Sequence, residues 1–486
     1  MTSNPILPGF HPDPSICRAG DDFYLVTSSF EYLPGVPIFH SRDLLRWKQI
    51  GNVLDRDDQL VLSGLSSGGV YAPTLRYCDG RFWMITTNVE EFGKGHLIVT
   101  ATDPAGPWST PVYTAGALGI DPDLTWDRDG TCYLTWASVL EENAISQAAI
   151  NPGTGTLLTE PRALWSGTGL AHPEAPHLYH RNSWWYLLLA EGGTERGHAV
   201  SVARSRSITG PYEGNPANPI LTHRSTSHPV QNTGHADLVE LPSGDWAAVY
   251  LGVRPRGTTP MFHVNGRESF LAAIRWEDDW PVFDENHYPV PEPDTAFDDD
   301  FSAPVLNPRW ISPGIHPARL AAPASHGGVA VTATDSPGRR GLLAVRAKDA
   351  HWEASAVIDA GRARLALRLD DAHWAGVDAQ GESITVRAVI GGLDHVVADA
   401  PRAHPGAVTL TVRAVAAPPG AGGPDQVELG YQETDTLHIL ARVDGRYFST
   451  EVAGGFTGRT IGIEALADVA VVSRFSYRPA SPLATL

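Results

Sequence analysis

Three acidic residues, Asp13, Asp121 and Glu174, each stand three or four positions ahead of an apolar residue in a repeated sequence pattern. Carboxylates brought close together raise one another's pKa, and burial raises it further, so a cluster of acids is costly to fold. Glycoside hydrolysis uses that perturbation, because one carboxyl must stay protonated for the leaving oxygen while another is ionised to activate water. The spacing therefore predicts a catalytic group for the hydrolysis of glycosidic bonds.

The elements that must position these acids are five copies of one pattern, a short apolar strand followed by a polar turn and an aromatic strand. Self-similarity at about 40 to 50 residues is typical of four-stranded β-propeller blades, and longer intervals leave room for loop insertions. Because the first strand of each blade lines the central channel, matching positions should converge on one axis. The copies are marked by Ile16, Leu75, Leu124, Leu178 and Leu238, at intervals of 59, 49, 54 and 60 residues.

The two remaining copies carry Ala72 and His235 at the matching position. Any single Asp before a proline could serve only as a turn residue. Ala72 indicates, however, that the repeated fold does not demand an acid at this position, which favours a functional reason for the three acids. His235 leaves two interpretations open: an imidazole that lines the channel and bonds to backbone or water, or a partner of the carboxylates or of an axial ion.

Length and composition narrow the classes of partner. The 486 residues include 36 Lys and Arg against 55 Asp and Glu, a formal net charge of −19. This balance argues against a nucleic acid or an anionic membrane, both of which need a clustered basic surface. A small neutral oligosaccharide fits it, and the sequence leaves a homo-oligomer open. Cys17, Cys78 and Cys132 are too scattered for a disulfide framework or a zinc site and are expected to be buried free thiols.

The predicted fold is all-β, a five-bladed β-propeller followed by a C-terminal β-sandwich. The 48 Gly and 39 Pro make turns frequent, and β-branched and aromatic runs recur throughout. We expect the propeller at 1–290, a Pro-rich acidic linker at 291–298 and the sandwich at 299–486. The N-terminus lacks the basic start and apolar run of a signal peptide, and no stretch reaches about 18 apolar residues, so we expect a cytoplasmic protein.

Several motifs in this order resemble glycoside hydrolase family 43, and within it the two-domain β-xylosidases and α-L-arabinofuranosidases. The motifs are His11-Pro-Asp-Pro-Ser, Gly69-Val-Tyr-Ala-Pro, Gly119-Ile-Asp-Pro, Pro173-Glu-Ala-Pro-His and Gly266-Arg-Glu. The resemblance runs from residue 4 to about 285, and the tail from Asp298 to Tyr477 is similar to the accessory β-sandwich of that group. It implies a five-bladed propeller and an inverting hydrolysis by single displacement, with the acid and base roughly 6.5 to 9.5 Å apart.

The resemblance also implies a role for each site residue. By its motif, Asp13 matches the general base, Glu174 the general acid and Asp121 the carboxylate that tunes and orients the acid. Arg267 matches an arginine that reaches the sugar hydroxyls.

Aromatic residues are expected to form the walls of the sugar pocket. Phe30 and Tyr71 resemble the family's wall residues, which offer flat apolar surfaces to a sugar ring. Tyr71-Ala72-Pro73 departs from the Trp-Ala-Pro of many relatives, which leaves the preferred sugar undecided. The sandwich of this group can lend an aromatic residue to the pocket rim, and Phe456 is the candidate, with a buried sandwich residue as the alternative.

We therefore expect an exo-acting glycosidase that removes terminal β-D-xylosyl residues from xylooligosaccharides. The alternatives are an α-L-arabinofuranosidase or an enzyme with both activities and, from other classes, a non-catalytic carbohydrate-binding propeller or a metal-dependent propeller enzyme that uses His235. No cofactor is required and no metal ligand is assigned, while a structural calcium ion in the propeller channel stays open.

Overall fold

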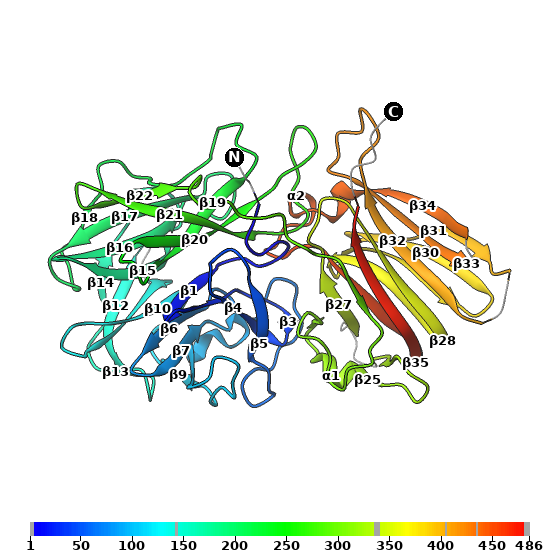
Figure 1. Cartoon of the computed structure of the whole chain (residues 1–486), viewed down its shortest axis with the longest axis horizontal. Coiled ribbons are helices and arrows are strands. Elements are labelled where there is room, and N and C mark those ends of the chain that lie inside the picture. Colours follow the sequence, from blue (N-terminus) through cyan, green and yellow to red (C-terminus); the bar gives the residue numbers. More distant parts are fainter. Residues whose placement is uncertain (1–3, 141–143, 335–340, 404–405, 434–435, 481–486) are drawn as a thin grey trace.

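The computed structural model describes residues 4–140, 144–334, 341–403, 406–433 and 436–480, and these form two β domains side by side. In Figure 1 the strands up to residue 284 form the left-hand domain, and those from residue 321 onward form the right-hand domain. The all-β prediction of a propeller followed by a sandwich is confirmed. Among the described residues, no helix combines the length and the hydrophobicity needed to cross a membrane.

Five antiparallel sheets form the blades of the propeller. Four have their strands in chain order, and in the third β12 pairs with both β13 and β14. Blade 1 contains β1 (Ser15–Ala19), β2 (Asp22–Val26), β4 (Gly35–Ser41) and β5 (Lys48–Leu54). Blade 2 contains β6 (Thr74–Cys78), β7 (Arg81–Thr86), β8 (Leu97–Ala101) and β9 (Val112–Tyr113), with the 3₁₀ turn η1 (Val89–Lys94) between its second and third strands. Blade 3 contains β10 (Gly119–Trp126), β11 (Cys132–Ser138), β12 (Ile145–Asn151), β13 (Thr156–Leu157) and β14 (Arg162–Trp165). Blade 4 contains β15 (Glu174–Arg181), β16 (Trp184–Glu191), β17 (Ala199–Ser205) and β18 (Glu213–Gly214), and blade 5 contains β19 (Gln231–Glu240), β20 (Trp246–Val253), β21 (Glu268–Glu277) and β22 (Trp280–Asp284).

The first strands of the blades close into a ring around the channel. Strand β1 contacts β6 and β19, β10 contacts β6 and β15, and β15 contacts β19. Each pair of neighbouring blades encloses an apolar cluster, and each cluster contains one of the five repeat marks named above. The marks are buried because apolar residues at this position fill the wedge between blades. The N-terminal segment also joins the last blade, where Ile6 N donates to Ser269 O at 2.9 Å.

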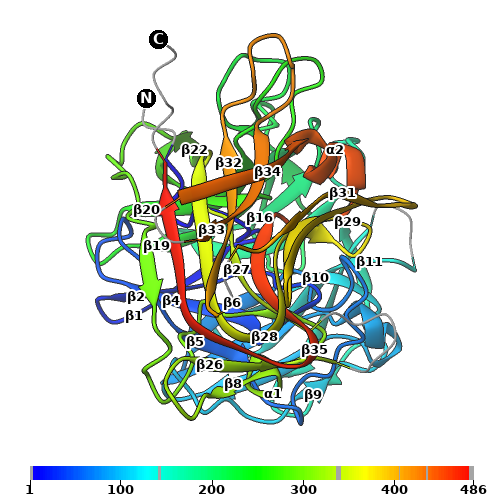
Figure 2. The same cartoon turned by 90° about the vertical axis from the view of Figure 1, so that its right-hand side faces the viewer.

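The sandwich is held together by two long strands, β28 (Trp352–Asp370) and β35 (Thr460–Pro479), which pair with each other over most of their length. Figure 2 shows both strands curving across the sandwich. The first half of β28 pairs with β32 and the second half with β29, so the strand passes from one layer to the other. The other strands are β23 (Phe297–Asp299), β25 (Ala321–Pro323), β26 (Val329–Thr332), β27 (Leu342–Arg346), β29 (His373–Gln380), β30 (Ser383–Ile390), β31 (Leu393–Pro401), β32 (Val408–Val415), β33 (Gln426–Glu433) and β34 (Thr436–Asp444). Short helical turns are α1 (Pro317–Leu320), η2 (Gly445–Phe448) and α2 (Thr450–Ala453).

The two domains are joined by backbone pairing and by buried charges. Strand β3 (Tyr32–Leu33) of the propeller pairs with β24 (Ser312–Pro313). Arg368 of the sandwich is buried, and its Nη1 lies 3.3 Å from Glu31 Oε1 and donates to the Tyr32 hydroxyl at 2.7 Å. This buried ion pair fixes how the two domains pack against each other, because separating them would leave Arg368 or Glu31 buried without a partner, which is costly.

Two details qualify the sequence predictions. Cys17 and Cys132 are buried free thiols as expected, but Cys78, at the end of β6, is partly exposed and corrects the prediction for that residue. The proposed linker at 291–298 already includes Phe297 and Asp298 of strand β23, which pairs with β35. The domain boundaries themselves stay a prediction.

Candidate active site

The predicted site residues meet at one cavity of about 300 Å³ near the starts of the first strands of the blades. All eight residues selected from the sequence line it, and Phe456 of the sandwich lines it too. The lining residues are Asp13, Phe30, Tyr71, Ala72, Ile120, Asp121, His172, Glu174, Gly193, Thr194, Glu195, His235, Arg267 and Phe456. The convergence of matching repeat positions is thus a property of the folded chain.

A shared backbone distortion turns these side chains toward the cavity. Asp13, Asp121, Ala175 and His235 have φ values of 55°, 53°, 51° and 49°, a left-handed conformation that non-glycine residues rarely adopt. Strands β10, β15 and β19 each carry a register shift at this level. Such irregularities re-aim side chains next to active sites, and each strained residue costs about 1–3 kcal/mol. Four blades therefore repeat one costly local geometry at the same place.

Asp13 is the acid that is held ionised. It is 4% exposed, its Oδ1 lies 2.8 Å from Arg267 Nη1, and its Oδ2 accepts from Ser28 Oγ at 2.5 Å. Burial alone would raise the pKa of Asp13, but the Arg267 guanidinium and the Ser28 hydroxyl together hold it below the ordinary value. At neutral pH this side chain is a carboxylate with one of its oxygens on a fixed cation.

Asp121 and Glu174 show the opposite behaviour. Burial, and then the neighbouring charges of Glu174 and Asp13, raise the pKa of Asp121 well above its usual range. Burial and the charge of Asp13 raise the pKa of Glu174 to about 7. Asp121 Oδ2 accepts from Ala175 N at 3.1 Å, so it is tied to the backbone beside Glu174. The cavity therefore holds one ionised acid and, near neutral pH, at least one protonated acid.

Arg267 connects the propeller acids to the sandwich. Its Nη1 donates to Thr194 Oγ1 at 3.1 Å and its Nη2 to the Phe456 carbonyl at 3.4 Å. The guanidinium carbon lies 5.6 Å from the centre of the Phe30 ring and 5.7 Å from that of Phe456, within the range of cation–π attraction. A Cβ added to the preceding residue, Gly266 (φ +80°), would stand 3.0 Å from Gly458 Cα of the sandwich. The close approach of the two domains thus requires glycine next to Arg267.

Phe30, Tyr71 and Phe456 form one aromatic wall. The ring centres of Phe30 and Tyr71 are 5.1 Å apart, those of Phe30 and Phe456 5.7 Å, and those of Tyr71 and Phe456 5.8 Å. Phe456 is 37% exposed, so the sandwich does lend an aromatic residue to the rim, and the alternative of a buried sandwich residue is wrong. The Tyr71 hydroxyl donates to the Ser67 carbonyl at 3.2 Å, which directs it to the backbone.

His235 lies beside the ionised acid. Its Nδ1 is 3.6 Å from Asp13 Oδ1, and burial lowers the pKa of the imidazole to about 3. The ring is therefore neutral at working pH. Of the two interpretations left open by the sequence, the geometry favours a partner of the carboxylates. Ala72, in the matching place of the second blade, leaves that side of the cavity without a charge.

Beneath the cavity, a second set of residues lies along the channel, one from the first strand of each blade. We call it the channel tier, and it comprises Ser15, Arg76, Asp123, His177 and Asp237. Arg76 Nη1 lies 2.8 Å from Asp237 Oδ2, and Arg76 Nη2 lies 2.9 Å from Asp123 Oδ1. A calcium ion needs six to eight oxygen ligands, whereas both acids here already face a guanidinium. The two acids of the channel tier, both paired with Arg76, therefore do not suit a calcium ion. Among the described residues, no group of three or more His, Cys, Asp or Glu could hold a metal ion.

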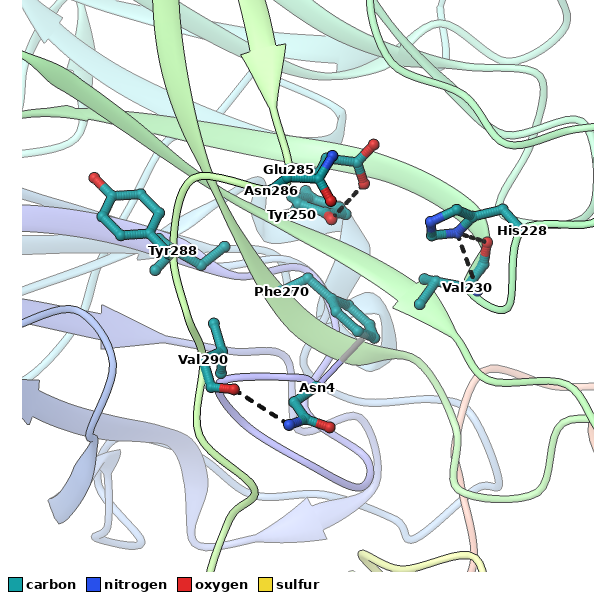
Figure 3. A pocket seen from close by; sticks show the side chains of 10 residues that line it. Asn4, His228, Val230, Tyr250, Phe270, Glu285, Asn286, Tyr288 and Val290 are labelled. Atoms are coloured by element: carbon teal, nitrogen blue, oxygen red, sulfur yellow. Dashed lines mark hydrogen bonds between the residues drawn. The ribbon is translucent and has the colours of Figure 1, made fainter. Parts of the chain in front are cut away.

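A further cavity, of about 140 Å³, lies on the flank of blade 5 (Figure 3). Glu285 is the one carboxylate among its described lining residues, and its two oxygens accept from the Tyr250 hydroxyl at 2.7 Å and pair with His223 Nε2 at 2.9 Å. Asn4 closes the lower side by donating to the Val290 carbonyl, as Figure 3 shows. A cavity with one fully engaged acid cannot supply an acid and a base, so the candidate active site is the larger cavity.

Comparison with known proteins agrees with this geometry. A family model described as glycosyl hydrolases family 43 matches residues 2–281, and one described as the beta xylosidase C-terminal concanavalin A-like domain matches residues 298–478. The chain belongs to glycosyl hydrolase family 43. A xylosidase/arabinosidase of Butyrivibrio fibrisolvens is 49% identical over 303 residues, which cover 58% of this chain and 56% of that protein. A non-reducing end alpha-L-arabinofuranosidase of Bacteroides ovatus is 47% identical over a match that covers 57% of this chain and 52% of that protein. The chain therefore matches about half the length of each of these two relatives.

Solved structures of family 43 proteins extend the match to both domains. The Bacteroides ovatus xyloglucan-locus family 43 structure has a TM-score of 0.88 at 33% identity and covers 98% of this chain and 99% of its own. A xylan beta-1,4-xylosidase from Bacillus halodurans has a TM-score of 0.88 at 29% identity and covers 98% of this chain and 100% of its own. The relation between propeller and sandwich is therefore shared across full-length family structures.

Several lining residues of this family 43 site were missed by the sequence analysis. Thr194, Glu195 and His172 come from loops between strands, where no periodic pattern marks a position. Ser28 follows β2 and reaches Asp13 only in the folded chain. Asp123 had a detectable signal, because it lies two residues after Asp121 and alternate residues of a strand share a face. The same spacing relates Asp237 to His235.

Proposed function

We propose that this protein is an inverting exo-glycosidase that hydrolyses terminal β-D-xylosyl residues from xylooligosaccharides. The observation that carries the proposal is the separation of proton affinities within one cavity. Asp13, paired with Arg267, is kept ionised, while Glu174, without a cation of its own among the described contacts, has its pKa raised to about 7. Such a pair of carboxyls with opposed pKa shifts is the arrangement that assigns base and acid.

In this proposal each residue acts through a contact described above. Asp13 takes a proton from a water molecule that attacks the anomeric carbon, and Glu174 gives its proton to the leaving glycosidic oxygen. Burial and the charge of Asp13 keep Glu174 protonated, and Asp121 holds the adjoining backbone through Ala175 N. Arg267 and the aromatic wall orient the sugar, the first by hydrogen bonds to hydroxyls and the second by contact with a ring face.

The sugar preference rests on the relatives and on the pocket together. The named relatives include a beta-xylosidase of Bacillus subtilis, 39% identical over 57% of this chain. A small cavity with an aromatic wall suits the end of a chain better than its middle. The alternative is an α-L-arabinofuranosidase, or one enzyme with both activities, which the names of the two relatives described above support.

Side-by-side rates on an aryl β-D-xylopyranoside and an aryl α-L-arabinofuranoside, with one preparation, test the substrate proposal. We expect a higher kcat/KM on the xyloside. A higher value on the arabinofuranoside would replace the main proposal by its alternative, and turnover of neither, together with retained sugar binding, would favour a non-catalytic propeller.

The stereochemistry is tested separately by proton NMR of the first product formed from a xylooligosaccharide. Single displacement predicts that the α-anomer of xylose appears first and then mutarotates. Early release of the β-anomer would contradict the inverting assignment, because it requires two displacements and a covalent intermediate.

A further inference from the structure

The channel tier defined above is a closed set of ionic and hydrogen-bond contacts around one arginine. Both Asp123 and Asp237 have fully buried side chains, and Arg76 lies between them with a side chain 15% exposed. Arg76 uses both terminal nitrogens: Nη1 donates to Asp237 Oδ2, and Nη2 lies 3.2 Å from Asp237 Oδ1 and 2.9 Å from both Asp123 Oδ1 and His177 Nδ1. Arg76 Nη1 also donates to the Ser15 hydroxyl at 3.4 Å, so all five blades meet at a single guanidinium.

The remaining acceptor positions of the two acids are also occupied. Asp237 accepts from the Ser15 hydroxyl at 2.6 Å and from the Tyr179 hydroxyl at 2.5 Å. Asp123 Oδ2 accepts from Thr125 Oγ1 at 2.9 Å and from Leu178 N at 3.1 Å. Burial alone would raise the pKa of both acids, but the guanidinium lowers the pKa of each, so the tier holds two carboxylates against one cation.

We propose that the Arg76 guanidinium is the structural cation of the propeller channel, and that it joins the blades there in place of a bound divalent metal ion. The two buried carboxylates, on blades 3 and 5, repel each other across the channel and require a positive charge between them. A planar guanidinium suits this position, because it offers several donors in one plane to acceptors on different strands. A calcium ion would have to displace the Arg76 guanidinium. The displaced guanidinium would then remain buried as a second cation beside the calcium ion.

The tier also bears on the candidate active site above it. Asp123 follows Asp121 by two residues on β10, and Asp237 follows His235 by two residues on β19. Anchoring these positions to Arg76 fixes the strand starts that carry the cavity residues. Loss of the guanidinium is therefore expected to loosen the site as well as the domain.

Thermal unfolding of the full chain tests the proposal. For the wild-type protein, treatment with a chelator or addition of millimolar calcium should leave both the melting temperature and the rate on an aryl glycoside unchanged. Arg76→Ser should lower the melting temperature by roughly 10 °C, because two buried acids lose their counter-charge. Arg81→Ser is the matched control, since Arg81 is an exposed arginine of the same blade whose side chain donates to Thr100 Oγ1.

Two results would overturn the proposal: a fall in wild-type melting temperature on chelation that calcium reverses, or an Arg76→Ser variant as stable as Arg81→Ser. If Arg76→Ser does not fold, the triple variant Arg76→Met with Asp123→Asn and Asp237→Asn, which removes the guanidinium and both buried acids, decides the matter. It should melt within a few degrees of the wild type, and failure of this variant to fold would contradict a role based on charge. Because melting is measured without substrate, the result is independent of the proposed glycosidase activity.

Discussion

The mouth of the propeller channel and its middle contain similar residues but opposite electrostatics. At the mouth, Arg267 forms an ion pair with Asp13, and the pKa values of the other two acids, Asp121 and Glu174, are raised. In the channel tier, Arg76 lies between two acids, and the pKa of each is lowered. Asp121 and Asp123 are both buried on strand β10 but have opposite pKa shifts, so burial does not account for the difference. The difference lies in the position of the cation and in how many acids share it. These two factors decide whether the pKa of an acid is raised, so that it can stay protonated near neutral pH.

The largest expected effect comes from removing the protonated acid at the mouth. Glu174→Gln keeps the shape of the side chain but cannot cycle a proton, so we expect kcat on a xylooligosaccharide to fall by about 10²–10⁴-fold. An aryl glycoside with a good leaving group should lose less, because it needs little protonation. Glu213→Gln, an exposed acid of the same blade, serves as the control. Equal losses on both substrates would argue against Glu174 as the acid.

Removing the cation at the mouth should make all three acids there behave alike. Arg267→Met leaves Asp13 buried without its partner, so its pKa should rise, and we expect kcat/KM to fall by about 10²-fold. The acid limb of the pH–rate profile should move to higher pH. Arg275→Met, an exposed arginine on β21, the strand that begins directly after Arg267, is the matched control. An unmoved acid limb would show that Arg267 does not set the ionisation of Asp13.

The pH dependence of activity follows from the same contrast. Glu174 works as an acid only while protonated, so kcat/KM should decline about tenfold per pH unit above the pKa of about 7. In its proposed role as base, Asp13 works only while it is ionised. Because its pKa is lowered, Asp13 stays ionised at pH values below the ordinary pKa of an aspartate. The plateau should therefore extend well into the acidic range. A profile that keeps rising above pH 8 would contradict the assignment of Glu174.

Stability should respond with opposite signs in the two regions. The pKa of Asp121 is raised in the folded state, so its contribution to stability is present at low pH and is lost as the pH rises. Asp121→Asn should therefore raise the melting temperature at pH 7 by about 2–4 °C and leave it unchanged at pH 4. A lowered pKa, as for Asp237, gives stability above the unfolded value, so Asp237→Asn should lower the melting temperature at pH 7. Differential scanning calorimetry at both pH values compares the two, and shifts of the same sign would remove the distinction.

The smallest effect is expected at the rim, where no charge changes. Phe456→Ala removes one ring from the aromatic wall, so KM should rise about two- to tenfold with kcat changed less. Tyr447→Ala, a similarly exposed aromatic of the sandwich at 39% exposure, is the control. A larger fall in kcat than rise in KM would mean that the Phe456 ring positions Arg267 more than it contacts the sugar.

Much of the fold and of the site was accessible from sequence because it depends on repeated local pattern. The apolar marks from Ile16 to Leu238 predicted five blades, and the residues before them predicted a converging group of acids. Thr194 and His172 could not be predicted, since loop residues follow no period. The partial exposure of Cys78 also depended on its place at the end of β6.

By itself the sequence determined which residues could meet, because the side-chain period of strands and the spacing of repeats place matching positions on one axis. Only the tertiary structure decided their charges. Asp13 and Arg267 are 254 residues apart in the chain, and Asp237 and Arg76 are 161 apart. A pKa depends on the distance to such partners and on burial, which no local pattern encodes. From sequence alone, either set of acids could have been a catalytic group or an ion-pair network. The placement of Arg267 made the acids at the mouth the candidate catalytic group, and the placement of Arg76 made the acids of the channel tier an ion-pair network.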